Sequence, residues 1–253
     1  MILAFVVAAA AVEPVIEELA DGAVDWTNLR LVVHGVGGGS TGAMANLEAA
    51  EGDARAELEP RVLALARAVR VDRARLAGEL LDAADAVADR LESNLSTWEV
   101  FEARYLASGR VELDAALSLQ TWLRPALVTF AHTPERPARP GGASGLVVDA
   151  RGLDVRCALA PELFDETGAH LYGIGDMTAY QASQHGPVVY VRDPADPAAA
   201  RRAGELPVHV RALRVQDGTD LVLGAEAASA VRAAGEAGDL LLHGKVVVVV
   251  GGS

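Results

Sequence analysis

The sequence predicts an α+β protein, and three observations carry that prediction. Between residues 29 and 119 the apolar residues first alternate, then recur every three or four residues, then alternate again. Residues 133–143 hold three prolines and two glycines, which is typical of a linker. Short apolar runs separated by turn signals follow this segment. We therefore expect a β-α-α-β-β domain, with two helices on a small sheet containing antiparallel strands, followed by a mixed α/β domain with hairpins.

The domain boundaries follow from the same pattern. We expect a signal peptide and leader over residues 1–23, the first domain over 24–132, the linker over 133–143 and the second domain over 144–253. Residues 2–12 are uninterrupted apolar, which is too short for a membrane span of about 20 residues but has the length of a signal-peptide core. Only the amino terminus precedes them as a positive charge, so there are two alternatives: the true start of the chain lies upstream, or this is an ordinary buried segment. Export would place the protein in the periplasm or outside the cell, without a transmembrane span in the mature chain.

The first domain begins with an alternating strand over residues 29–34, followed by a glycine-rich turn over Gly35–Gly42. Apolar residues at helical spacing from Met44 to Val69 predict one long amphipathic helix, in which Pro60 introduces a kink or starts a new segment. A second helix is expected from about Asp72. Residues 97–106 and 110–119 then alternate around a turn at 107–109, which predicts a hairpin.

The second domain contains clear turn and capping signals. Strands are expected at 146–150 and 188–191, with a hairpin turning at Asp165-Glu166-Thr167-Gly168. Asp196-Pro197 predicts the start of a short helix that Gly204 ends. Asp217-Gly218 predicts a second hairpin, and a helix is expected over 225–237. The five valines of 246–250 do not alternate, so that strand should be covered on both faces.

Composition narrows the classes of function. The chain of 253 residues carries a formal net charge of −13, which repels phosphate backbones and argues against nucleic acid as a partner. The single cysteine, Cys157, excludes an internal disulfide and sits in an apolar stretch, which favours a core role. The six histidines show no metal-binding spacing. We therefore expect no metal and no cofactor.

The glycine-rich turn holds the most suggestive motifs. Gly37, Gly39 and Gly42 fit a dinucleotide-binding fingerprint, but a second helix follows where that fingerprint requires a strand. Gly38, Ser40 and Gly42 fit a hydrolase nucleophile elbow, but too few strands precede them to build the usual sheet. We expect these glycines to turn a strand sharply into a helix. An enzyme that uses Gly35–Gly42 to bind a nucleotide, or Ser40 to hydrolyse an ester, remains the alternative.

The other polar and aromatic candidates have ordinary explanations. Four acids of the second domain could pair in space, although turn and cap roles are commoner for such residues: Asp149, Asp154, Asp165 and Asp176. The tryptophans Trp26, Trp98 and Trp122 are expected to anchor the core. We therefore assign no catalytic, cofactor-binding or metal-binding residue.

Five stretches of the sequence resemble a known bacterial pattern. In the second domain these are residues 144–153, Ala160-Pro161 and residues 165–173; in the first they are residues 24–27 and 105–112. They resemble bacterial envelope proteins similar to the small outer-membrane-associated lipoproteins and to the N-terminal domain of flagellar assembly protein T. The chain lacks the cysteine that lipid anchoring of such proteins requires. The resemblance implies an exported, non-catalytic envelope protein.

Together these observations predict a binding or assembly protein of the cell envelope. Its partners would be unknown envelope proteins, and pairing of exposed sheet edges between copies would give a homo-oligomer.

Overall fold

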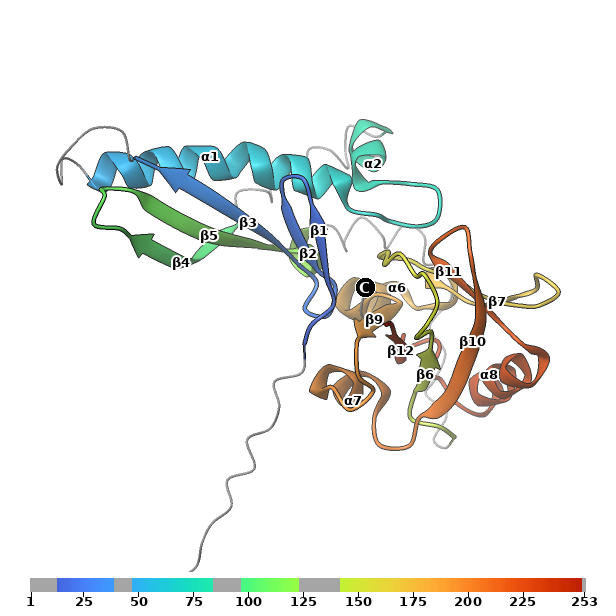
Figure 1. The fold of residues 1–253 in the computed structure, drawn as a ribbon. Coiled ribbons are helices and arrows are strands. Elements are labelled where there is room, and N and C mark those ends of the chain that lie inside the picture. Colours follow the sequence, from blue (N-terminus) through green and yellow to red (C-terminus); the bar gives the residue numbers. More distant parts are fainter. Residues whose placement is uncertain (1–12, 39–46, 84–96, 123–141, 252–253) are drawn as a thin grey trace, which may run out of the picture.

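A computed structural model describes residues 13–38, 47–83, 97–122 and 142–251 of the chain. It contains two sheets with helices packed against them (Figure 1). The expected α+β class is confirmed. Residues 133–141 of the expected linker and residues 39–42 of the expected glycine-rich turn lie outside the described residues.

The first sheet is antiparallel throughout and has the order β1-β2-β3-β5-β4. The predicted strand over residues 29–34 and the predicted hairpin are both confirmed. The bounds of the strands are β1 Ile16–Leu19, β2 Gly22–Asp25, β3 Arg30–Gly37, β4 Glu99–Tyr105 and β5 Val111–Ser118.

One long helix, α1 (Leu47–Ala68), covers one face of this sheet (Figure 1). Every second residue of β5 is fully buried beneath it, and α1 buries a row that includes Ala54, Leu58 and Leu65. The predicted amphipathic helix is therefore confirmed. It runs through Pro60 without a break, so the expectation that a new segment might start there is wrong.

Two expectations for the first domain need correction. The leader was expected to reach residue 23, but β1 and β2 form a hairpin that pairs with β3, so residues 16–23 belong to the first sheet. The second helix, α2 (Ala77–Ala83), begins five residues later than Asp72. The Asp72 carboxylate accepts hydrogen bonds from the backbone N–H groups of Ala74 and Arg75 and holds a turn there.

The second sheet is mixed and has the order β8-β7-β11-β10-β6-β12-β9. Strands β10, β6, β12 and β9 are parallel neighbours, while the β7–β8 and β10–β11 pairs are the two predicted hairpins. The bounds are β6 Leu146–Asp149, β7 Leu163–Asp165, β8 His170–Tyr172, β9 Val188–Val191, β10 Val208–Gln216, β11 Asp220–Leu223 and β12 Val246–Val249.

Helices cover both faces of the second sheet, as the unbroken valines of β12 predict. Helix α7 (Pro197–Ala203) packs on one face with β9, β6 and β12, and α8 (Ala225–Ala237) packs on the other. The caps of α7 are as expected, because the Asp196 carboxylate accepts from the Ala198 N–H at 2.7 Å and Gly204 follows with a φ of +75°. Three short elements had no clear sequence signal: α4 (Leu119–Trp122), η2 (Ile174–Asp176) and α6 (Ala179–His185).

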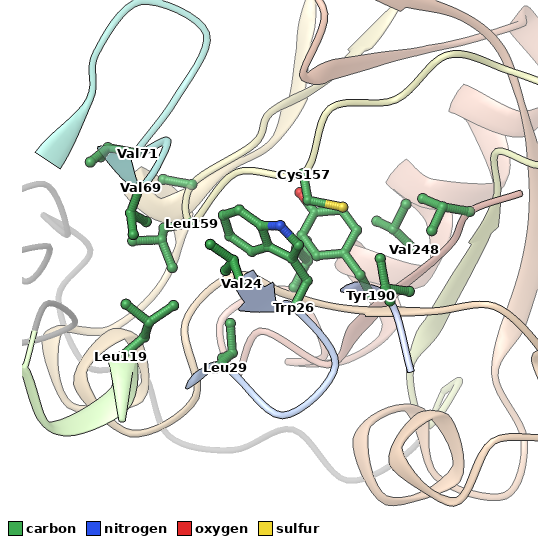
Figure 2. Close-up of a cluster of buried hydrophobic side chains, with 14 of the residues drawn as sticks. Val24, Trp26, Leu29, Val69, Val71, Leu119, Cys157, Leu159, Tyr190 and Val248 are labelled. Carbon is green, nitrogen blue, oxygen red and sulfur yellow. The ribbon is translucent and has the colours of Figure 1, made fainter. Parts of the chain in front are cut away.

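The two domains share one apolar core rather than meeting through a polar boundary (Figure 2). Trp26 lies at its centre, with Leu159 on one side and Tyr190 and Val248 on the other. The rings of Trp26 and Tyr190 meet edge to face, with centroids 6.0 Å apart. The Thr27 hydroxyl donates to the Tyr190 carbonyl oxygen at 2.8 Å. These contacts hold the first sheet against the end of the second.

Backbone hydrogen bonds cross the same junction. The N–H of Leu159 donates to the carbonyl of Arg70, and the N–H of Ala160 donates to that of Val71. The Tyr190 hydroxyl donates to the Ala158 carbonyl at 3.0 Å. The segment after β6 is therefore fixed between the two sheets.

Candidate functional site

A hollow with a volume of about 630 Å³ lies at the junction. We call it the β1 cleft. It is lined by residues 15–18 of the first domain, by Trp26, and from the second domain by residues 152–157, Arg192 and residues 250–251. Its volume falls within the range of about 300–1,000 Å³ that is typical of ligand sites.

The topology of the second sheet explains why residues so distant in sequence meet there. Strands β6, β9 and β12 are parallel, so their carboxyl ends lie at the same edge of the sheet. Residues 150–154 follow β6, Arg192 follows β9 and Val250 follows β12. Ligands of open α/β sheets bind outside the carboxyl ends of the strands, which is where the first domain closes the β1 cleft.

Arginine side chains hold the backbone around this cleft. Arg192 donates from Nε to the carbonyl of Pro14 at 3.2 Å and from Nη1 to that of Gly251 at 3.1 Å. Arg70 donates from Nη1 to the carbonyl of Cys157 at 2.8 Å and pairs with Glu17 at 3.3 Å. Hydrogen bonds from charged donors are stronger than neutral ones, so these contacts make the cleft walls rigid.

Glu17 is engaged a second time. Its carboxylate accepts from Nε1 of Trp26 at 2.8 Å, which satisfies the indole N–H of the buried ring.

Burial raises the pKa of the Cys157 thiol well above its usual range. Cys157 is therefore a protonated core residue beside the cleft, as its apolar neighbours predicted.

A second hollow, of about 370 Å³, lies elsewhere on the junction, and we call it the Arg73 cleft. It is lined by residues 71–75 of the first domain and, in the second, by Ala160, Glu162, residues 174–175 and Asp220. The two clefts share no residue.

Charges pair across the Arg73 cleft. The Arg73 guanidinium lies 3.1 Å from the Asp220 carboxylate and 3.7 Å from that of Glu162, and it stacks over the Phe164 ring. Burial raises the pKa of Asp220, although the N–H of Glu162, the Thr219 hydroxyl and Arg73 offset part of this effect. Asp220 is thus a buried carboxylate held by structural partners from both domains.

The glycine-rich turn is only partly described, and its first glycines have another role than the one expected. Gly35 and Gly37 lie within β3, so the turn does not begin at Gly35. A Cβ on Gly37 would lie 1.9 Å from the carbonyl oxygen of Ala50, and one on Gly35 would lie 2.5 Å from that of Ala54. These glycines let α1 pack directly on the strand. Among the described glycines of this segment, Gly38 alone, with a φ of +72°, shows the left-handed backbone expected of a turn.

Most of the residues proposed for the alternative nucleotide-binding or ester-hydrolysing site, namely Gly39, Ser40 and Gly42, lie outside the described residues.

The four acids considered for pairing do not pair with one another, and three of them have partners of their own. Asp149 pairs with Arg151 at 2.7 Å, which lowers its pKa to about 2, and Asp176 lies 3.7 Å from His170. Asp165 holds its hairpin turn, because its carboxylate accepts from Thr167 and from the Ala169 N–H. Asp154 alone lines the β1 cleft.

The tryptophans differ in their surroundings. Trp26 is fully buried at the junction, as expected of a core anchor, whereas Trp98 is half-buried at the start of β4. The side chain of Trp122 lies outside the described residues.

Within the described part of the chain, no helix has the length and apolar character that a membrane span needs. Nor does any group of three or more His, Cys, Asp or Glu side chains among these residues have a metal-binding arrangement.

Sequence reasoning named Asp154 and Cys157 near the cleft but missed Arg70, Arg73 and Arg192. Arg192 directly follows a buried strand, and that position was the available signal. Nothing in the local sequence marks Arg70 or Arg73, because their partners are distant in the chain.

Among the comparisons with known proteins, no curated protein matches the chain. Residues 145–252 match the family model described as Treponema pallidum Tp0624, second domain, and the match covers the second sheet but none of the first. The second domain of this protein is therefore similar to the second domain of a bacterial protein, Tp0624 of Treponema pallidum.

Proposed function

We propose that this chain is a non-catalytic, exported protein of the bacterial cell envelope that binds a partner protein in the β1 cleft. The observation that carries the proposal is the cleft itself, which both domains line at the carboxyl ends of three parallel strands. A site built from two domains that share a core is pre-organised for binding.

Three further observations support the proposal. The second domain is similar to a domain of a bacterial protein. The apolar run of residues 2–12 has the length of a signal-peptide core. The resemblance to small outer-membrane-associated lipoproteins and to flagellar assembly protein T points to the same compartment.

The chemistry of the cleft is that of a binding site. Glu17 and Arg192, which line the cleft, and Arg70, which binds Glu17 and the carbonyl of Cys157, form hydrogen bonds within the protein. Such groups hold a fixed surface rather than exchange protons with a substrate.

Fractionation of bacterial cells that express the full chain tests the location. We expect the chain in the periplasmic fraction, released by osmotic shock together with a periplasmic marker enzyme. A chain recovered only with a cytosolic marker would contradict export.

A fluorophosphonate probe tests the non-catalytic part of the proposal. We expect no more labelling of the wild type than of Ser40→Ala. Labelling of the wild type that disappears in the variant would favour the hydrolase.

A further inference from the structure

Strand β1 is an edge strand, and its free edge faces the β1 cleft. It stands at the end of the first sheet and, among the strands that the structure describes, pairs with β2 alone. The N–H of Trp26 donates to the carbonyl of Val15 at 2.8 Å, and hydrogen-bonded pairs alternate in antiparallel strands. Glu17 therefore shares its hydrogen bonds with β2, while the backbone groups of Ile16 and Glu18 point away from β2.

Both of these outward-facing residues line the cleft. Within the described residues, no backbone hydrogen bond to the N–H or carbonyl groups of Ile16 and Glu18 comes from the opposite wall, residues 152–157. A row of unpaired strand groups is a template for another strand. The cleft thus offers main-chain hydrogen bonds along one wall and space beside them.

The remaining lining determines which side chains the occupant should carry. Val15, Leu153, Val155 and Val250 supply apolar surface, which suits alternate residues of an extended segment.

Two carboxylates of the cleft lack an ion-pair partner among the described residues. Glu18 on β1 and Asp154 on the opposite wall are exposed. Arg192 and Arg156 also line the cleft, and both donate to backbone carbonyls: Arg192 to those of Pro14 and Gly251, and Arg156 to that of Asp217. These bonds direct the two guanidinium groups toward the protein's own backbone without neutralising their charge, so the preference for a basic partner rests on Glu18, Asp154 and the charge of the whole chain. The net charge of −13 adds a long-range attraction for basic partners.

We propose that the β1 cleft binds an extended, basic peptide segment of a partner protein, which adds to the free edge of β1 as a further strand. This rests on the proposed function, and names the chemistry of the partner. Backbone pairing with Ile16 and Glu18 supplies the main-chain contacts. Lys or Arg side chains of the segment pair with Glu18 and Asp154.

Fluorescence anisotropy with two labelled probe peptides tests the proposal. One probe alternates Val with Lys and the other alternates Val with Glu, and both are titrated with the purified full chain. We expect the Lys peptide to bind at least tenfold more tightly than the Glu peptide, and its binding to weaken as NaCl is added. Equal affinity for both peptides, or no binding of either, would overturn the proposal.

Variants separate the two kinds of contact. Ile16→Pro removes an N–H that points away from β2, and an edge strand tolerates this change. It should weaken the Lys peptide at least threefold while the thermal melt stays close to wild type. The double variant Glu18→Gln, Asp154→Asn should weaken the same peptide roughly three- to tenfold.

A control matched to the single variant Glu18→Gln makes the same charge change elsewhere. Glu99→Gln alters an exposed acid on β4, the opposite edge strand of the same sheet, and should leave peptide affinity unchanged. An equal loss in Glu99→Gln and in Glu18→Gln would show general charge attraction and would overturn the docking at β1.

A photo-crosslinking residue placed at position 18 in intact cells distinguishes this inference from the proposed function. A crosslinked envelope protein, without affinity for the Lys peptide, would overturn strand addition and leave the proposed function standing. If no envelope protein is crosslinked and the Lys peptide does not bind, both the proposed function and this inference would be contradicted. A crosslink to a second copy of the chain would replace the partner protein with self-assembly and overturn the inference.

Discussion

The two clefts at the junction use their charges in opposite ways. In the Arg73 cleft, a cation of the first domain neutralises a buried carboxylate of the second, Asp220. In the β1 cleft, the arginines bind backbone carbonyls, and Glu18 and Asp154 keep their carboxylates exposed. A buried charge is costly unless it is paired, whereas an exposed one costs little. One cleft therefore fixes the two domains together, and the other leaves charge available for a partner.

The largest expected effect comes from Trp26, which lies in the core that both clefts border. Trp26→Ala should lower the free energy of unfolding by about 3–5 kcal/mol, because it empties the centre of the shared core. Urea denaturation followed by far-ultraviolet circular dichroism measures this. We also expect the single transition of the wild type to split into two as the domains uncouple.

The matched control is Trp98→Ala, the same chemical change at a half-buried position. Trp98→Ala should lower the free energy of unfolding clearly less than Trp26→Ala does. If both variants lost the same free energy, the junction would not be the centre of stability.

The second effect tests the charge pairing of the Arg73 cleft. Arg73→Met keeps much of the apolar stem but leaves Asp220 without its cation. The loss at neutral pH should be about 1–3 kcal/mol in the free energy of unfolding, measured by urea denaturation. Arg75→Met is the control, since Arg75 pairs with Asp72 three residues away at a more exposed site. That change should cost about 0–1 kcal/mol. The reverse order would mean that the pairing across the cleft contributes nothing.

The smallest effect is a pair of opposite pH dependences. Burial raises the pKa of Asp220 above its ordinary value of 3.8, so its ionisation opposes folding as the pH rises through the raised pKa. Asp149 behaves in the opposite way, because Arg151 lowers its pKa to about 2. The ionised carboxylate of Asp149 stabilises the fold above about pH 4, and this stabilisation is lost as the pH falls toward 2.

Urea denaturation at a series of pH values measures both contributions. Relative to wild type, Asp220→Asn should gain stability as the pH rises through the raised pKa, over and above any constant offset from lost hydrogen bonds. In the wild type, protonation of Asp149 lowers the free energy of unfolding below pH 4. Asp149→Asn should not show this part of the decline. Parallel curves for both variants would contradict the contrast between the buried carboxylate of Asp220 and the half-buried, arginine-paired carboxylate of Asp149.

Local signals were sufficient for much of the fold. Asp196 and Gly204 bound α7 as predicted, because a side-chain cap and a left-handed glycine act within a few residues. Asp217 and Gly218 both have positive φ and turn the β10–β11 hairpin, as an Asp-Gly pair predicts. The alternation in β5 likewise identified which of its residues face the core.

The misassigned glycines show where such signals are insufficient. Gly35 and Gly37 continue the alternation of β3 on its core side, but glycine is also the commonest turn residue. Their true role is to accept the backbone of α1 at close range, which depends on a helix later in the chain. The same applies to β1: its two adjacent glutamates have no strand signal, and only pairing with β2 makes the segment a strand.

The sequence by itself determined the fold class, the hairpins, the capped helices and the excess of negative charge, because these depend on neighbours a few residues apart. Tertiary structure alone decided that the domains share a core around Trp26, and that residues 15–18 and 152–157 form one cleft. The physical reason is that these contacts join segments more than a hundred residues apart. Their partners are selected by the order of strands in the two sheets and by packing, which no local pattern encodes.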